Sequence, residues 1–125
     1  MKEYLLVGTG SFVGGVSRYF LSGLALHMFA SQRFPIGTLV VNFLGCLAIG
    51  ILSGLAEHHH LFTQNLRILL ITGLLGGFTT FSAFGYETIY LVRTNNLNLA
   101  ILNVVLSLVL CLTAVWLGTK IIQMT

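Results

Sequence analysis

The sequence predicts an all-α membrane protein, and its composition and the spacing of its few charges carry the prediction. Of its 125 residues, 56% are hydrophobic and 7% are charged, and the mean hydropathy is +0.95. A soluble domain is about one quarter charged, so this composition is typical of a chain surrounded by lipid. Since lipid offers no partner to an unpaired N–H or C=O group, each crossing segment is expected to be a helix.

Charged residues divide the chain into long apolar segments. In the second segment no ionisable side chain occurs between Arg33 and Glu57. At about 1.5 Å per residue, that length crosses a hydrocarbon core of roughly 30 Å. Glu87 is the only charge inside the third segment, and the fourth is uncharged up to Lys120. We therefore predict one transmembrane domain over residues 1–125. Its four predicted spans cover about 4–29, 36–56, 67–93 and 97–120.

The first segment is the least regular, because Arg18 follows a short apolar run. We still expect a helix there, since an apolar segment of this length is more easily accommodated in lipid as a helix than as a loop. A cleaved signal peptide is disfavoured by the single basic residue Lys2, followed directly by Glu3, and by the lack of a small-residue cleavage motif. Pro35, the sole proline, suits the start of the second helix, where an N–H would have no intrahelical acceptor.

The positive charges do not strongly favour one orientation in the membrane. With four spans, both termini and the middle loop lie on one side of the membrane, which carries Lys2, Arg67 and Lys120. The opposite side carries Arg33 and Arg93, and Arg18 lies nearer to it. Orientation normally follows an excess of Lys and Arg in cytoplasmic loops. The near balance leaves open a weakly biased chain guided by its first helix, or dual topology with copies inserted both ways. Copies in both orientations would close most simply as an antiparallel two-fold dimer.

Glycines recur at four-residue spacing in three of the segments. The pairs are Gly10 with Gly14, Gly50 with Gly54, and Gly73 with Gly77. This spacing places two bare positions on one helix face, where another backbone can approach closely. We interpret most of these pairs as packing positions and expect a different role only in the third segment.

The third segment is expected to contain a helix break. It reads GLLGGFTTFSAF from Gly73 to Phe84, with Gly76 and Gly77 close to two threonines. Each glycine lowers helix propensity by about 1 kcal/mol. Broken helices are tolerated in membranes where the freed backbone groups line a site, and such a site can hold an ion. Carbonyl groups would suit a cation and N–H groups an anion, so the residues leave the charge of the ion open.

Two phenylalanines follow the expected break. Phe81 and Phe84 are three residues apart and share a helix face, while Ser82 points elsewhere. Phenyl edges carry partial positive charge and can face an anion. Lipid contact or packing is the more frequent use of such residues, so the position alone does not decide their role.

Polar side chains deep in the predicted spans form a second set of candidates. In the second span, Asn42 follows Thr38 by one turn on the same face, and in the fourth span Asn103, Ser107 and Cys111 recur every four residues. Such groups either hydrogen-bond between helices or line a path for water and ions. Both interpretations stay open.

The remaining titratable residues receive simpler interpretations. Arg18 and Glu87 lie deepest in the spans and each needs a partner or water. For Arg18 we favour an ion pair or a place near the interface, whereas Glu87 is also a candidate proton carrier of a coupled transporter. Cys46 and Cys111 are interpreted as small apolar side chains. The run His58 to His60 is interpreted as a solvated loop, because consecutive imidazoles lack metal-site spacing.

Several function classes are disfavoured by what the sequence lacks. It contains no paired nucleophile and base, no phosphate loop and no dinucleotide-binding motif. Its basic residues are too few and scattered for nucleic acid. We therefore expect neither enzyme activity nor nucleic-acid binding.

Three segments together resemble the signature of the Fluc, or CrcB, family of fluoride channels. They are GSFVGGVSRY at 10–19, PIGTLVVNFLG at 35–45 and GLLGGFTTFSAFGYE at 73–87. Each segment alone is a weak match. Their order on four spans of matching length makes the resemblance specific, and it covers essentially the whole chain.

The resemblance implies a passive fluoride-selective channel in the cell (inner) membrane, built as a dual-topology antiparallel homodimer with two pores and a structural sodium ion. Phe81 and Phe84 match the pore phenylalanines whose ring edges meet fluoride, and Asn42 matches the pore amide. Gly76 and Thr79 match the break positions whose carbonyl groups hold sodium. Further expected polar contributors to the path are Ser82, Thr38, Thr80, Asn103 and Ser107.

The match to the family is incomplete in two places. Some members carry a tyrosine and then serines on the fourth span, where this chain has Asn103, Ser107 and Cys111, and Ala83 stands where many have threonine.

Two other functions stay open. One is a proton-coupled exporter of the small multidrug type, in which Glu87 would replace the acid of the first span. The other is a non-transporting scaffold subunit of a larger membrane complex.

Overall fold

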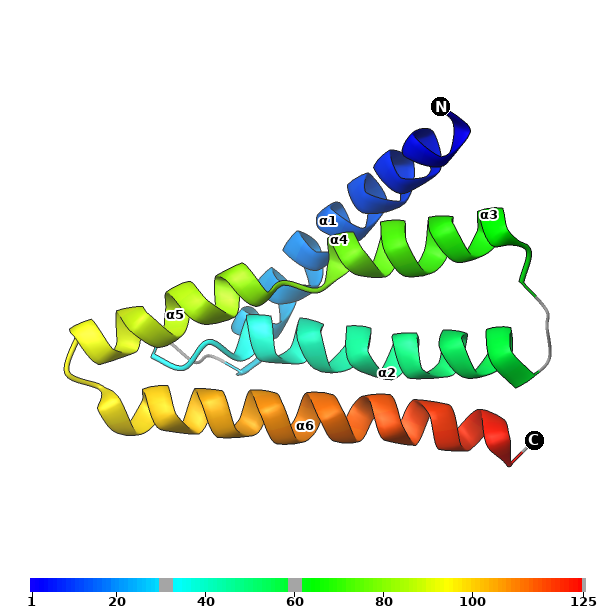
Figure 1. Ribbon diagram of the computed structural model, residues 1–125. Coiled ribbons are helices and arrows are strands. Elements are labelled where there is room, and N and C mark those ends of the chain that lie inside the picture. Colours follow the sequence, from blue (N-terminus) through cyan, green and yellow to red (C-terminus); the bar gives the residue numbers. More distant parts are fainter. Residues whose placement is uncertain (30–32, 59–61, 125) are drawn as a thin grey trace.

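The chain folds into helices joined by short connections (Figure 1). The computed structural model describes residues 1–29, 33–58 and 62–124. The elements in chain order are α1 (Lys2–Phe29), α2 (Ile36–His58), α3 (Gln64–Arg67), η1 (Ile68–Leu75), α4 (Gly76–Phe78), α5 (Phe81–Arg93) and α6 (Leu97–Gln123). No strand occurs in these described ranges, which confirms the predicted all-α class.

Three helical stretches among the described residues are long and apolar enough to cross a membrane: Ile36–Glu57, Gln64–Arg93 and Leu97–Gln123. They agree with three of the predicted spans. The helix α1 has the predicted extent, with 28 residues. It is less apolar because it includes Arg18 and several small polar residues, and it falls outside this group. Membrane crossing by α1 therefore stays a prediction.

The helices α2 and α6 run parallel and lie side by side along most of their length (Figure 1). Their contact depends on small residues. A Cβ atom added at Gly118 would lie 2.5 Å from the Leu47 carbonyl oxygen, and one at Gly50 would meet the carbonyl of Val115. One turn further on, Gly54 faces the side chain of Ile122. The packing role predicted for this glycine pair is confirmed.

The helix α1 packs against η1 and α4 in the same manner. A Cβ atom at Gly10 would lie 2.5 Å from the Leu69 carbonyl oxygen, and one at Gly77 would lie 2.5 Å from that of Ser11. The Ser11 hydroxyl also donates to the Gly73 carbonyl at 3.3 Å. Glycines on both sides thus bring α1 against the backbone of the third segment, as their spacing predicted.

The third segment changes its helix type before it breaks. Residues Ile68–Leu75 form π-helical turns, which were not predicted and which in other proteins are frequent at functional sites. After α4 the backbone is extended at Thr79, with φ −79° and ψ 156°, and at Thr80, with φ −149° and ψ 115°. The predicted break in the glycine–threonine stretch is confirmed, and it falls at the two threonines while Gly76 and Gly77 stay helical.

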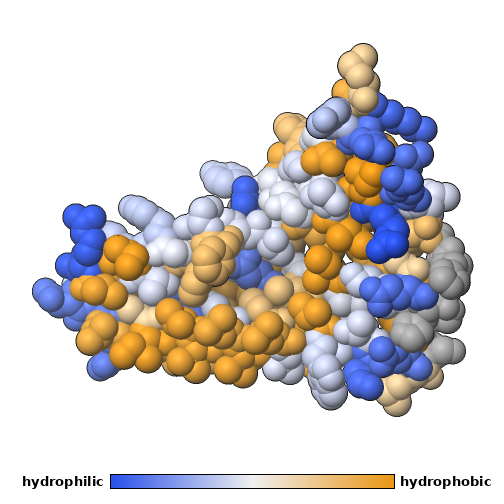
Figure 2. Space-filling view, viewed as in Figure 1, coloured by the Kyte–Doolittle hydropathy of each residue, from blue (hydrophilic) through white to orange (hydrophobic). Residues whose placement is uncertain are grey.

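The outer surface of α6 is strongly apolar. Figure 2 shows hydrophobic residues covering much of this helix, with hydrophilic residues gathered towards the two ends of the molecule. The exposed large side chains of α6 include Ile101, Val105, Leu108, Leu112 and Trp116. Such a face suits lipid or another membrane helix.

Candidate functional site

The break in the third segment is held by one side chain from α2. The Asn42 Oδ1 accepts a hydrogen bond from the Thr80 N–H at 2.8 Å, and its Nδ2 donates to the Thr80 carbonyl at 3.0 Å. One amide thus pairs with both backbone groups of Thr80. Because an unpaired backbone group is costly inside lipid, this pairing stabilises the extended conformation at the break.

The same geometry frees two carbonyl groups. In a continuous helix the Thr80 N–H would donate to Gly76, and the Ala83 N–H would donate to Thr79. Instead the Thr80 N–H donates to Asn42, and the Ala83 N–H donates to the Thr80 hydroxyl at 3.2 Å. The carbonyl oxygens of Gly76 and Thr79 therefore lack the donors that an unbroken helix would give them.

Hydroxyl groups surround the start of α5. The Thr80 Oγ1 caps the helix through Ala83 and lies 3.1 Å from the Ser82 Oγ. The Thr79 hydroxyl instead turns back and donates to the Leu75 carbonyl at 3.0 Å. Since one hydrogen of the Thr80 and Ser82 pair is used between the two oxygens, the other is available to an anion or to water.

Phe81 and Phe84 line a hollow of about 340 Å³ between the third segment, α2 and α6, which we call the aromatic hollow. Their ring centroids are 5.3 Å apart with the planes tilted by 42°, so the shared face predicted from the sequence is confirmed. Asn42 and Ser107 line the same hollow. Phe81 is 81% exposed in the single chain. Its ring is therefore free to meet a ligand, lipid or another chain.

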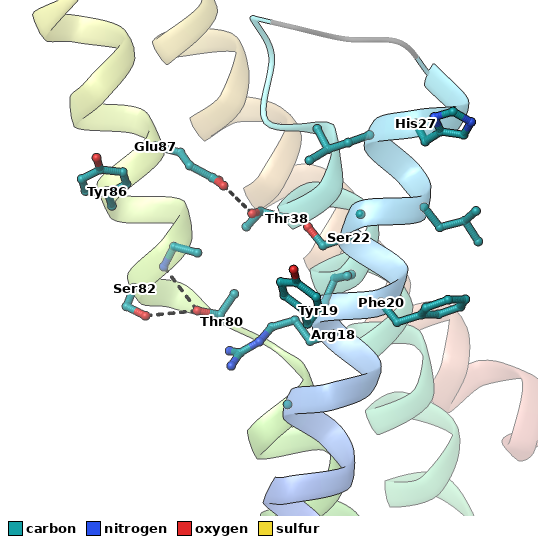
Figure 3. Close-up of a pocket in the computed structure, with 16 residues that line it drawn as sticks. Arg18, Tyr19, Phe20, Ser22, His27, Thr38, Thr80, Ser82, Tyr86 and Glu87 are labelled. Carbon is teal, nitrogen blue, oxygen red and sulfur yellow. Dashed lines mark hydrogen bonds between the residues drawn. The ribbon is translucent and has the colours of Figure 1, made fainter.

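A second hollow of about 1130 Å³ lies between α1, α2 and α5, and we call it the polar hollow (Figure 3). Its polar lining residues include Arg18, Tyr19, Ser22, Thr38, Thr80, Ser82, Tyr86 and Glu87. Thr80 lines both hollows, so they meet at the helix break. Thr80 therefore separates an open polar space from the pair of phenyl rings.

Glu87 points into the polar hollow from α5 (Figure 3). The buried Thr38 hydroxyl donates to its Oε1 at 2.6 Å, and its Oε2 is buried without a hydrogen-bond partner in the described part of the chain. Arg18 lines the same hollow, but Figure 3 shows its side chain turned towards Thr80 rather than towards Glu87. The partner of Glu87 is therefore a threonine, which α2 supplies.

The polar residues of α6 lie in different environments. Ser107 lines the aromatic hollow, whereas Asn103 is 2% exposed and donates to the Thr88 hydroxyl at 2.9 Å. Thr88 in turn donates to the Phe84 carbonyl at 2.7 Å. Asn103 thus reaches the phenylalanine only through Thr88. The sequence analysis did not select Thr88. The feature that could have indicated it is its position one helical turn after Phe84, from which its hydroxyl reaches the Phe84 carbonyl.

The structure describes the two cysteines in full but only part of the histidine run. Cys46 and Cys111 are unpaired and half-buried, and both line the aromatic hollow. The histidine run lies mostly outside the described residues, since His59 and His60 are not among them. In the described part of the chain, no cluster of three or more His, Cys, Asp or Glu side chains suits a metal ion.

Three long apolar helices, one of them broken where an amide, hydroxyls and free carbonyl groups gather, define a multi-pass helical membrane protein. Residues 5–119 match the family described as "CrcB-like protein, Camphor Resistance (CrcB)". The chain belongs to this CrcB family.

Curated relatives match the chain over nearly its full length. A protein of Methylobacillus flagellatus named "Fluoride-specific ion channel FluC" is 45% identical over 125 residues, which cover 100% of this chain and 98% of the relative. A protein of the same name from Ruminiclostridium cellulolyticum is 45% identical over 94% of this chain and 92% of its own length. A third, from Shewanella amazonensis, is 43% identical over 98% and 97%.

Proposed function

We propose that this chain is a fluoride-selective channel that lets fluoride leave the cell passively across the cell (inner) membrane. The observation that carries the proposal is the helix break at Thr80, which Asn42 holds between the polar hollow and the aromatic hollow. Full-length similarity to proteins named fluoride-specific ion channels supports the choice of ion. The mechanism is conduction and involves no enzymatic step.

The chemistry of the site suits a small anion that must lose water. Fluoride holds its hydration shell tightly, so a pore has to replace that shell with donors and still release the ion. One hydroxyl hydrogen of the Thr80 and Ser82 pair is available near the break, together with the Ser107 hydroxyl and the edges of Phe81 and Phe84. No lysine or arginine is among the described residues that line the aromatic hollow, so a fixed cation does not trap the anion there.

Three polar residues have supporting roles in this proposal. Thr38 holds the Glu87 carboxylate on the wall of the polar hollow. Asn103 acts through Thr88, whose hydroxyl is bonded to the backbone at Phe84. Arg18 lies in the polar hollow, where its charge attracts anions towards the break.

The proposed assembly is a single-domain chain with four spans that pairs as an antiparallel, dual-topology homodimer with two pores. The near balance of positive charges on the two sides supports insertion in both orientations. Exposed apolar residues on α1, including Phe12, Val13 and Val16, are available to lipid or to a second copy. Close packing of Gly10 against η1, and of Gly77 against Ser11 of α1, supports placing α1 in the membrane with the other helices.

The freed carbonyl groups at the break fit a structural sodium ion. Gly76 and Thr79 lack helical donors because Asn42 and the Thr80 hydroxyl take them. Carbonyl oxygens of unwound helices are suitable ligands for sodium in membrane proteins. When bound, the ion would supply positive charge that fixes these oxygens and stabilises the break. Two copies related by a two-fold axis would supply the carbonyl groups twice.

The test is efflux from liposomes that contain the purified chain. We expect rapid fluoride release without a proton gradient, and little chloride release under the same conditions. Cation uptake that requires a proton gradient would favour the exporter, in which the unpartnered oxygen of Glu87 would carry the proton. Protein that is folded in lipid yet conducts neither anion would favour the scaffold subunit.

A further inference from the structure

Two cysteines line the aromatic hollow from two neighbouring helices. Cys46 of α2 and Cys111 of α6 both line this hollow. Each is half-buried and neither forms a disulfide. They are the only two cysteines of the chain, so any thiol chemistry of the protein belongs to this pair.

The helix packing explains why the two thiols meet. Gly50 of α2 approaches the carbonyl of Val115 of α6, and these residues lie four positions after Cys46 and Cys111 respectively. Because α2 and α6 run parallel, residues one turn earlier on each helix face each other in the same register. The close backbone approach at Gly50 therefore brings the two sulfur atoms together one turn before it.

We propose that Cys46 and Cys111 form a binding site for a soft, thiophilic metal cation of the class of Hg²⁺, Ag⁺ and Cu⁺, held between the two sulfur atoms. Thiolate sulfur is the soft ligand that such ions prefer over oxygen and nitrogen. These ions favour linear coordination by two ligands, which suits a site formed by two sulfur atoms. With Hg²⁺, two S–Hg bonds form, two S–H bonds break, both protons go to water and no electrons are transferred.

The position of the site predicts an effect on the ion path. The thiols share the aromatic hollow with Phe81, Phe84 and Ser107. A large ion bridging the two sulfurs would occupy space in this hollow beside the rings. Bound metal is therefore expected to slow fluoride efflux. This consequence rests on the proposed function, whereas metal binding itself does not.

The test is titration of the purified full-length chain with Hg²⁺ in a buffer free of added thiols and fluoride. We expect one ion to bind per chain, with two protons released and both thiols lost to a thiol-reactive dye. Cys46→Ser and Cys111→Ser each remove one ligand. Loss of a residue that only hydrogen-bonds to a metal ligand weakens binding by roughly 10- to 100-fold. Loss of a ligand itself should therefore weaken the binding of Hg²⁺ by more than that. Cys46→Ala and Cys111→Ala provide a second set if a serine variant fails to fold.

Efflux in liposomes is measured in parallel, with each variant compared with its own rate before Hg²⁺ is added. Inhibition of the wild type that the Cys46→Ser, Cys111→Ser double variant does not show supports the site. Binding of two ions per chain, or unchanged affinity in either single variant, would overturn it, because each thiol would then act alone. Mercury-bridged dimers on a denaturing gel would also overturn it. If metal binds as expected but no variant conducts fluoride, the proposed function fails while the metal site stands.

Discussion

Asn42 is hydrogen-bonded to both backbone polar groups of Thr80, at 2.8 Å to the N–H and 3.0 Å to the carbonyl. The two residues are 38 positions apart and lie on different spans. The pairing lets the third segment leave its helix inside the membrane without leaving these two groups unpaired. It also turns the chain so that Phe81 and Ser82 begin a new helix with different hollows on its two sides.

Replacing Asn42 by leucine should therefore damage both stability and conduction. The variant keeps the volume but leaves the N–H and C=O of Thr80 without a partner, at about 1–3 kcal/mol for each buried group. We expect a lower unfolding temperature in detergent and loss of most fluoride efflux. Leu44→Ala, on the same helix with a side chain 39% exposed, is the matched control and should change neither. Normal efflux in Asn42→Leu would show that the amide does not hold the break.

The two phenyl rings give a prediction about conduction alone. Phe81→Ile and Phe84→Ile keep apolar bulk but remove the ring edges. We expect efflux to be roughly tenfold slower if about 1.4 kcal/mol of stabilisation along the path is lost with each ring edge. Elution of the purified variants as dimers would show that assembly is intact. Phe29→Ile, at the end of α1 and away from both hollows, serves as the control. The ring-edge proposal is wrong if both variants conduct normally.

Much of the fold could be predicted because its causes are local. Charged residues mark the ends of the helices, glycine spacing marks their close contacts, and a three-residue interval puts Phe81 and Phe84 on one face. The break was expected within the stretch of adjacent glycines and threonines, and it occurs at its two threonines. Gly77 stays helical, and Ser11 of α1 packs directly against it.

The features that were missed depend on contacts between distant segments. The π-helical turns of η1 lie where α1 crosses the third segment, and local propensity does not encode that crossing. Asn42 was recognised as a polar group deep in its span, yet nothing in the neighbouring sequence identified Thr80 as its partner. Likewise the sequence left open whether Asn103 lines a path or contacts another helix, and it did not identify Thr88 on the preceding helix as its partner.

Gly77 offers a prediction about packing. A Cβ atom there would lie 2.5 Å from the Ser11 carbonyl oxygen, so α1 would have to move away from α4. We expect Gly77→Ala to destabilise the folded chain by about 1–3 kcal/mol, as overpacking does elsewhere. Gly85→Ala is the contrast, because nothing lies within 4 Å of the added carbon and alanine favours the helix. Thermal unfolding of both variants in detergent measures the difference, and equal stability would contradict the close approach of α1.

Glu87 distinguishes a channel from a proton-coupled exporter. Glu87→Gln cannot carry a proton, but its amide oxygen can still accept the hydrogen bond that Thr38 donates at 2.6 Å. A passive channel should therefore keep its fluoride efflux in this variant, whereas an exporter should lose transport. Glu87→Ala removes the acceptor and leaves the buried Thr38 hydroxyl unpaired, so slower efflux is expected from it. Efflux of each variant with and without a proton gradient decides between the two mechanisms.

Sodium dependence tests the carbonyl groups of Gly76 and Thr79, which lack helical donors at the break. A cation that binds only the folded protein stabilises it, and above its dissociation constant each tenfold rise in concentration adds about 1.4 kcal/mol. We therefore expect the unfolding temperature of the dimer to rise with sodium and not with choline at equal ionic strength. Asn42→Leu should weaken this response, because without the amide nothing holds the extended backbone at Thr80 that keeps these carbonyl groups in place. Identical stability in sodium and choline would remove sodium from the proposal while leaving the anion path untouched, since the phenyl rings and hydroxyls lie on the other half of the break.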